Sequence, residues 1–445
     1  MKIEIYAILL VVGLLIWVET GRSGETLEPA QLVVQDVISE SPAYAAGIEQ
    51  GDVLLQYNGV AVYSMNDVAE LKRLVTSDSV DVVVARNGKR ITLRLPAGEM
   101  GVYLKEVLDE LEYAEDAVVI GGIPKLDWST GKSNSFLAAV EALANHLGVD
   151  RDYVYIYGVS GAAFRLHFYR GWCPSSPDPT CGYNAGEQAL HALGLEHHFE
   201  SVSEGDTLGH SRLRNEIMAS IDRGIPVIAI DLIRIPEWGI ITGYQAGGQQ
   251  LLCRTYFDRR EGYDVAEKFP WAVCFLDGKK EMPSDADNYK RSFLIALENL
   301  TTPEYGEYAS GLAAFDTWTE SLENEDLSAM DGEKCAMVST ANAWTYERLI
   351  DDRMVAAQYL ERIAGDFPLL TGKILELAKL YREESELLKP AEEVAVYEFD
   401  MKTRHDWSAE MRQEAVLRLR KAEGKEKAAL QIWKEIANLT AESKE

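Results

Sequence analysis

The sequence predicts a multidomain α+β protein with an apolar N-terminal segment, a small β-rich domain, a larger α+β domain and a C-terminal helical bundle. A length of 445 residues exceeds what one small core organises. Strand-like runs between turn signals fill the first part of the chain, and helical periodicity replaces them afterwards. We place the segments at residues 1–19, 20–29, 30–104, 105–282 and 283–445.

Charge and cysteine content exclude several classes of function. The net charge is −28 and the pI about 4.7, which argues against nucleic-acid binding because phosphate contacts need a basic face. Five cysteines are too few for a disulfide framework. Cys173 and Cys181 share a Pro/Gly-rich stretch and could pair in an oxidising compartment or stay free. No Cys/His spacing suits a metal, so we expect neither metal nor cofactor.

The N-terminal segment is expected to meet a membrane. Residues 5–18 read IYAILLVVGLLIWV, an uncharged run slightly short of a comfortable bilayer span. A poor cleavage site favours an uncleaved signal anchor over a cleaved signal peptide, and a buried helix is a third reading. The anchor reading predicts a single-pass membrane protein whose globular part lies outside the cytoplasm. Residues 20–29 are expected to form a polar linker.

The first domain alternates strands with two short helices. The expected elements, in order, are a strand at 31–38, a helix after Ser41-Pro42 closed by Gly47, a strand ending at Asn58-Gly59, a helix at 66–76, and a hairpin of strands 80–85 and 91–95 around Asn87-Gly88. Residues 41–60, SPAYAAGIEQGDVLLQYNGV, carry Ser-Pro, Ala-Gly-Ile, Gly-Asp and Asn-Gly at a characteristic spacing. In this the domain resembles a PDZ domain of the bacterial type.

That resemblance implies a partner: an extended peptide or protein C terminus that adds a strand to the sheet edge. Loop amides would hold the terminal carboxylate, usually in an apolar-Gly-apolar run before the first strand. Residues 27–30 do not match that run, and the nearest match, Met100-Gly101-Val102, follows the last expected strand. We expect the groove beside the 66–76 helix, lined by Val68, Leu71 and Lys72. Alternatively the two apolar residues are core and Lys72 is a solvated charge.

The second domain mixes helices and buried strands. The expected elements are a helix at 135–147, strands at 153–157 and 225–231, a helix at 213–223, and a hairpin of 238–244 with 251–257. The runs GVSGAAFR at 158–165, GIPV at 224–227 and ITGY at 241–244 resemble papain-like cysteine peptidases of the bacteriocin-processing branch. They resemble more closely the N-terminal domain of the butirosin-biosynthesis acyltransferase group.

The papain-like resemblance requires a cysteine at a helix N terminus, a histidine base and an orienting third residue. The matching positions hold Asn134 and Ser135, then Glu237, and finally Asp258, so the cysteine and histidine are missing. Ser133 or Ser135 is then a helix N-cap. The resemblance with these replacements predicts a pseudoenzyme that binds a ligand between the 135–147 helix and the 225–258 strands. Arg165 and Trp238 are the expected pocket residues.

The C-terminal region has helical spacing throughout. Helices are expected at 288–299, 307–322, 333–364, 370–388 and 408–441, with Trp318, Trp344, Tyr359 and Trp407 in the bundle core.

Three functions remain. The leading one is a membrane-tethered, non-catalytic peptide- and ligand-binding protein. The rival is an acyltransferase or hydrolase with non-standard residues, either Ser135 with a histidine from another loop or a Glu237–Asp258 carboxylate pair. The third is a structural module whose helices assemble with another protein.

Overall fold

The computed structural model describes residues 30–325, 330, 332–397 and 407–442. The expected membrane segment and linker at 1–29 lie outside these residues. Within the described part of the chain, no helix has both the length and the apolarity needed to cross a bilayer.

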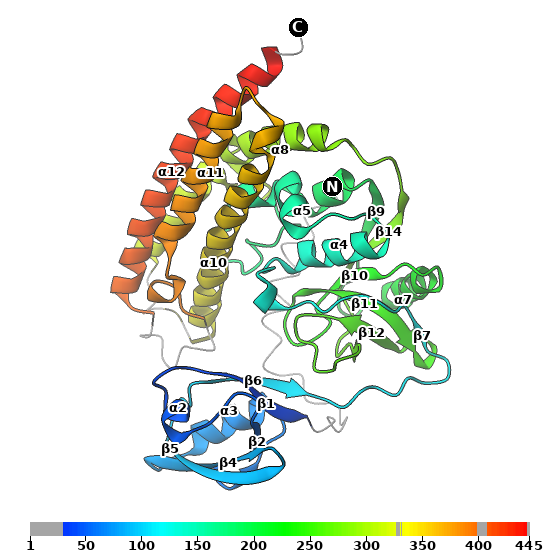
Figure 1. Cartoon of the computed structure of the whole chain (residues 1–445), viewed down its shortest axis with the longest axis vertical. Coiled ribbons are helices and arrows are strands. Elements are labelled where there is room, and N and C mark those ends of the chain that lie inside the picture. The colour runs from blue at the N-terminus through cyan, green and yellow to red at the C-terminus, as the bar shows by residue number, and fades with distance from the viewer. Residues whose placement is uncertain (1–29, 326–329, 331, 398–406, 443–445) are drawn as a thin grey trace.

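The first domain is a six-stranded antiparallel sheet with two helices (Figure 1). Its elements are β1 (Gln31–Val37), α2 (Pro42–Ala46), β2 (Val53–Tyr57), β3 (Val60–Ala61), α3 (Met65–Leu74), β4 (Ser79–Arg86), β5 (Lys89–Pro96) and β6 (Val102–Val107). The strand order is β5-β4-β2-β1-β6, with β3 on β2. Ser41 caps α2, and Gly47 ends it with φ 83°. Ser64 and Asp67 form a capping box at the start of α3.

Two strands of this sheet were absent from the sequence prediction: the two-residue β3 and the longer β6. We expected Met100-Gly101-Val102 to follow the last strand, but it leads into β6, which pairs antiparallel with β1. The sheet therefore runs to Val107, beyond the last expected strand at 91–95. The partner of β6 is the first strand of the domain, and local turn signals carry no information about so distant a pairing.

The second domain is built on an antiparallel sheet in the order β13-β12-β11-β10-β14-β9, with β7 on β11. Its strands are β7 (Val118–Val119), β9 (Leu195–Ser201), β10 (Val227–Ile230), β11 (Trp238–Gln245), β12 (Gln250–Arg254), β13 (Asp264–Val265) and β14 (Ala272–Lys279). Its helices are α4 (Ser135–His146), α5 (Tyr153–Ser160), α6 (Ala185–Ala192) and α7 (Thr207–Asp222). Helix α4 packs on β11 and β10, so its first turn faces the start of β11.

The expected strand at 153–157 was wrong: these residues form α5. Asp152 caps the helix by accepting from the Tyr155 amide at 2.9 Å, and Gly161 ends it in the left-handed conformation. The β-forming tyrosines are accommodated because neighbours cover the helix on nearly every side. A Cβ at Gly158 would come within 2.1 Å of the Tyr359 ring, so α5 lies directly on the C-terminal helices.

The C-terminal region is helical, as expected. It contains α8 (Asp285–Thr301), α9 (Gly311–Asn324), α10 (Gly332–Ile363), α11 (Thr371–Leu388) and α12 (Ala409–Glu442). The strands β15 (Glu304–Tyr305) and β16 (Tyr308–Ser310) pair with β8 (His167–Phe168). Short 3₁₀ turns lie at Trp128–Thr130, Ala162–Phe164, Ala246–Gly248, Ala364–Asp366 and Ala391–Glu393.

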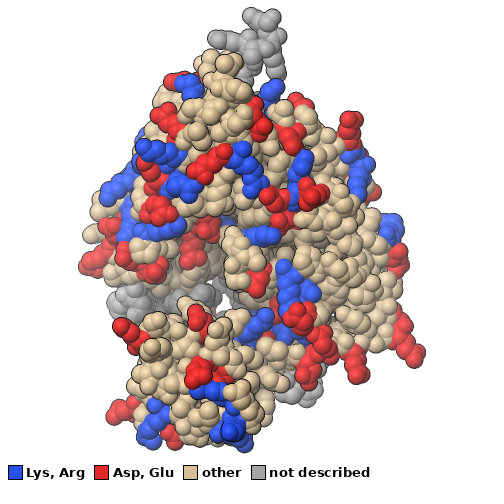
Figure 2. Space-filling view, in the orientation of Figure 1, with Lys and Arg blue, Asp and Glu red and all other residues tan. Residues whose placement is uncertain are grey.

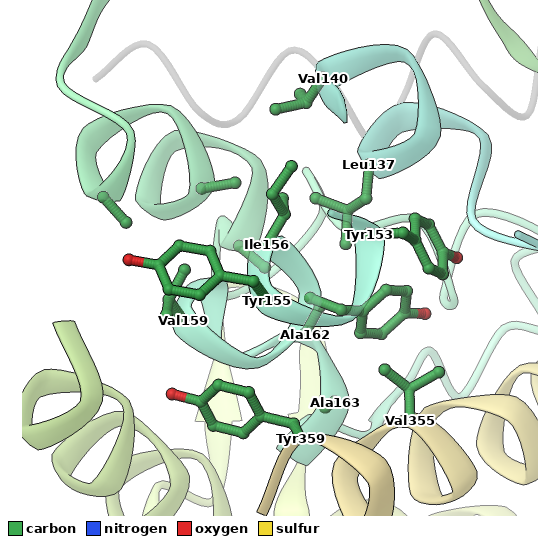
Figure 3. Packing of buried hydrophobic residues seen from close by; sticks show 14 of the residues in the cluster. Leu137, Val140, Tyr153, Tyr155, Ile156, Val159, Ala162, Ala163, Val355 and Tyr359 are labelled. Atoms are coloured by element: carbon green, nitrogen blue, oxygen red, sulfur yellow. The ribbon is translucent and has the colours of Figure 1, made fainter. Parts of the chain in front are cut away.

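Helices α10, α11 and α12 pack side by side, and α10 continues the core of the second domain (Figure 1). Leu137, Ile156, Val355 and Tyr359 meet where α4, α5 and α10 converge (Figure 3). Of the expected bundle residues, Trp318, Tyr359 and Trp407 are buried and Trp344 is half-buried. The second domain and the bundle thus share one core.

Candidate functional site

The first candidate site lies between β6 and α3. Within the described residues β6 pairs with β1 alone, so its other edge is unpaired and lies beside α3. Leu104 is opposite Val34 and Glu106 is opposite Leu32. Val34 and Leu32 are buried in the core, and directly opposed residues share a face. Leu104 and Glu106 therefore point to the side of the sheet that α3 covers.

A glycine-containing loop at 98–101 opens this groove. The Gly101 carbonyl accepts from the Ile38 amide at 2.9 Å and from the Ser41 hydroxyl at 3.2 Å. Gly101 has φ 75°, and a Cβ there would come within 2.2 Å of the Ser41 Cβ. The Ser-Pro segment that starts α2 thus also fixes the loop before β6.

The predicted groove residues take different positions around that loop. Lys72 forms an ion pair with Glu99 at 2.9 Å, which places a cation beside the loop. Leu71 is partly buried against the domain core. Val68 is 4% exposed and belongs to the core itself. Glu99 and Leu104 were missed because β6 was not expected. For the same reason Gly101 was named only as part of a run that follows the last expected strand.

A comparison with family models decides the identity of this domain. The model described as "PDZ domain" matches residues 33–86, from β1 through β4. A PDZ domain occupies residues 33–86. The unpaired edge of β6 and the loop at 98–101 lie just beyond the matched residues. The papain-like resemblance of the second domain stays a prediction.

One curated relative shares part of this chain. A Borreliella burgdorferi protein named "Putative zinc metalloprotease" is 28% identical over 122 residues, 26% of this chain. The chain spans about a quarter of that protein's length, since the aligned segment is 26% of it. The described residues contain no group of three or more His, Cys, Asp or Glu placed to hold a metal.

The second candidate site lies at the first turn of α4. Asn134, not Ser133 or Ser135, is the N-cap, and it accepts from the Leu137 amide at 3.1 Å. The Ser135 hydroxyl donates to the Glu237 carboxylate and accepts from the Trp238 amide at 3.2 Å. Burial raises the pKa of Glu237 above its ordinary value. The structure thus brings together Ser135 and Glu237, which occupy the nucleophile and base positions of the resemblance.

The third predicted position does not join them. Asp258 accepts from Arg254 at 2.8 Å and from the Thr255 amide at 2.7 Å. Among the described residues no histidine hydrogen-bonds to Ser135. The adjacent His197 and His198 lie on β9, where His198 contacts Glu216 and Asp277. The described contacts therefore give Ser135 a carboxylate partner and no imidazole.

The expected pocket residues are buried and fully engaged. Arg165 is 3% exposed and donates to the carbonyls of Ser176, Pro177 and Cys181. The Trp238 indole donates to Asp178 at 2.7 Å. The ring of Phe136 packs edge-on against the ring of Trp238, with 4.9 Å between the ring centroids. Side chains therefore fill the space between α4 and β11. The cavity beside Arg165 encloses about 10 Å³, roughly one water.

A larger cavity of about 120 Å³ lies along another side of α4. Its lining includes Lys132 and Glu141, which pair with each other, and Lys125, which pairs with Glu261 at 2.5 Å.

The remaining expected feature is the cysteine pair. Cys173 and Cys181 are free thiols, and the Tyr308 hydroxyl lies 3.9 Å from the Cys173 sulfur.

Proposed function

We propose that this protein is a peptide receptor that binds the free C terminus of an extended ligand between β6 and α3. The observation that carries the proposal is the unpaired edge of β6 directly after the Gly101 loop, in a chain with a PDZ domain. A peptide strand added there would satisfy the edge's backbone groups.

The groove suggests what such a ligand looks like. The terminal carboxylate would lie at the 98–101 loop, where it would take the place of Glu99 on the Lys72 ammonium. Alternate ligand side chains would point toward Leu104 and Leu71, which favours an apolar residue at the C terminus. The ligand class is therefore a protein or peptide tail with an apolar last residue.

The remaining parts of the proposal rest on the sequence. The uncharged run at 5–18 supports tethering through a single N-terminal membrane segment, with the globular part outside the cytoplasm. The missing cysteine and histidine support a papain-like second domain that is kept for binding rather than catalysis.

The test is selection from a random library of octapeptides with free C termini, using the full chain. We expect enrichment of apolar last residues. Lys72→Gln should weaken binding of the selected peptide about tenfold because it removes the cation beside the loop. Arg94→Gln is the matched control, since Arg94 lies on β5 at the opposite edge of the sheet in an exposed ion pair. Absence of any enriched peptide, or equal effects of both substitutions, would contradict the proposal.

The hydrogen bond between Ser135 and Glu237 favours a second candidate function, a hydrolase or acyltransferase. Glu237 would accept the Ser135 proton as the hydroxyl oxygen attacks an acyl carbon. It would return that proton to the leaving group as the bond between the acyl carbon and that group breaks. The raised pKa of Glu237 suits a general base. Labelling by a fluorophosphonate probe that is lost in Ser135→Ala and reduced in Glu237→Gln would establish this function. Unlabelled wild-type protein would exclude it for that class of electrophile.

A further inference from the structure

The far end of the PDZ groove is crossed by one side chain. Glu106 lies on β6 and faces α3, and one oxygen of its carboxylate accepts from the amide of Met65, the first residue of α3, at 2.8 Å. The Lys72–Glu99 ion pair lies at the opposite end, beside the 98–101 loop. The groove therefore has a charged boundary at each end.

The other oxygen of Glu106 reaches into the second domain. It pairs with the Arg234 guanidinium at 2.7 Å, and the Glu106 side chain is only 10% exposed. The second domain holds Arg234 in place: its carbonyl accepts from Lys268 at 2.7 Å and its amide donates to Glu267 at 3.3 Å. Arg234 is thus a positioned cation at the upstream end of the groove.

Hydrogen bonds to backbone carbonyls continue this junction beyond β6. The Leu108 amide donates to the Arg259 carbonyl at 2.8 Å, and Arg260 donates to the Asp109 carbonyl. Charged side chains of both signs gather where the first domain meets the rest of the protein (Figure 2). Because β6 leads directly into these contacts, a movement of Glu106 would alter the hydrogen bonds between the two domains.

A bound strand can be counted along β6. If it runs antiparallel with its carboxylate at the loop, its last residue lies opposite Val102, and each upstream residue advances by roughly 3.3 Å. Glu106 is then opposite the fifth residue from the ligand's C terminus. A tetrapeptide would stop short of Glu106, whereas a longer ligand would pass its side chain.

We propose that Glu106 and Arg234 determine specificity upstream of the last four ligand residues, with the second domain supplying Arg234 to the groove. The proposal rests on the peptide-binding function above. An acidic side chain at the fifth position would take the place of Glu106 on Arg234, so the groove would select long ligands with Asp or Glu there. Displacing Glu106 would also loosen the junction between the domains.

Fluorescence polarisation on the full chain tests this with two probes. One is the selected octapeptide with its fifth residue from the C terminus set to Glu, and the other is its last four residues alone. Glu106→Gln should strengthen octapeptide binding, and Arg234→Gln should weaken it about tenfold, with less than about a twofold change for the tetrapeptide. Lys72→Gln is the matched control and should weaken both probes by the same factor.

Hydrogen exchange of the Leu108 amide supplies the second readout. The octapeptide should speed its exchange in the wild-type protein and the tetrapeptide should not. Equal effects of the Glu106 and Arg234 substitutions on both probes, with unchanged exchange at Leu108, would overturn the inference. Failure of both probes to bind would instead contradict the proposed function, and faster Leu108 exchange in ligand-free Arg234→Gln would still show whether the pair holds the junction.

Discussion

The hydroxyl of Ser135 donates a hydrogen bond to the carboxylate of Glu237, which joins the first turn of α4 to the residue before β11. The Trp238 amide donates to the same hydroxyl oxygen. Ser135 thus has one donor and one acceptor partner on a single segment of the neighbouring strand. This arrangement ties the helix to the sheet.

Ser135→Ala should therefore destabilise the second domain. The buried Glu237 carboxylate would lose a donor, which costs about 1–3 kcal/mol when a buried polar group is left unpartnered. Urea unfolding of the full chain, followed by the fluorescence of the buried tryptophans, measures the change. Ser211→Ala is the control, because Ser211 is an exposed helical serine bonded to the Thr207 carbonyl, and it should cost less than about 0.5 kcal/mol. Equal losses would mean that the Ser135–Glu237 bond is not a structural joint.

Gly101→Ala should disrupt the loop before β6. A methyl group there would meet Ser41, and the backbone has a positive φ, so the cost should be about 3 kcal/mol or more. Gly88→Ala is matched in conformation, with φ 73° against 75°, and nothing lies within 4 Å of its Cβ. It should cost about 1 kcal/mol. The protection of the β1 and β6 amides from hydrogen exchange compares the two variants, and it should fall further in Gly101→Ala. Similar protection in both variants would show that Ser41 does not constrain the loop.

Arg353→Met should be severely destabilising. Arg353 is 1% exposed in the helical core and forms ion pairs with two fully buried carboxylates, those of Glu384 at 3.2 Å and of Glu426. Burial raises the pKa of both carboxyls, and removing the shared cation should cost about 3–5 kcal/mol.

Arg382→Met is the control for Arg353→Met. Arg382 pairs with Glu361 at 2.7 Å, but the two side chains are 41% and 45% exposed, so the substitution should cost less than about 1 kcal/mol. Thermal unfolding of both variants gives the comparison. If the Arg353→Met and Arg382→Met variants unfold at the same temperature, the ion pairs of Arg353 with Glu384 and Glu426 do not have the assigned role.

Asp352 should make stability depend on pH. Burial raises its pKa from 3.8 to about 6, against the opposing charge of Arg348. Between these two values the folded protein keeps a proton that the unfolded chain has lost. The contribution of Asp352 to the free energy of unfolding is therefore complete below about pH 4, and it is lost as the pH rises through about 6. The loss should approach roughly 3 kcal/mol. Urea unfolding across this pH range should show the free energy of unfolding falling with pH in the wild-type protein but not in Asp352→Asn. If the two proteins show the same pH dependence, Asp352 is not the group responsible.

The sequence was informative where structure is local. Ser41-Pro42, Gly47, Asn58-Gly59 and Asn87-Gly88 located the turns and caps of the first domain, because capping and hairpin chemistry act within a few residues. Capping residues also stand at the two ends of α5, in Asp152 and Gly161, but the prediction followed the β-forming tyrosines between them. Contact with α10 decides that segment, and such tertiary contacts override propensity.

The candidate sites show the complementary limit. Ser135 and Glu237 were placed by the papain-like resemblance, and the structure brings them together across 102 residues of chain. The contact of Glu106 with Arg234 had no sequence signal, because it depends on how one domain docks on the next. The edge position of β6 was missed because β6 pairs with the first strand of its domain, which lies far away in the sequence.

The most direct test of the central claim compares the selected octapeptide with its C-terminal amide on the full chain. If the ligand's carboxylate is held at the 98–101 loop while its backbone pairs with β6, the free acid should bind at least about tenfold more tightly. It should also slow hydrogen exchange in residues 98–107. Equal affinities of acid and amide, or protection confined to residues outside β6 and its loop, would contradict the account.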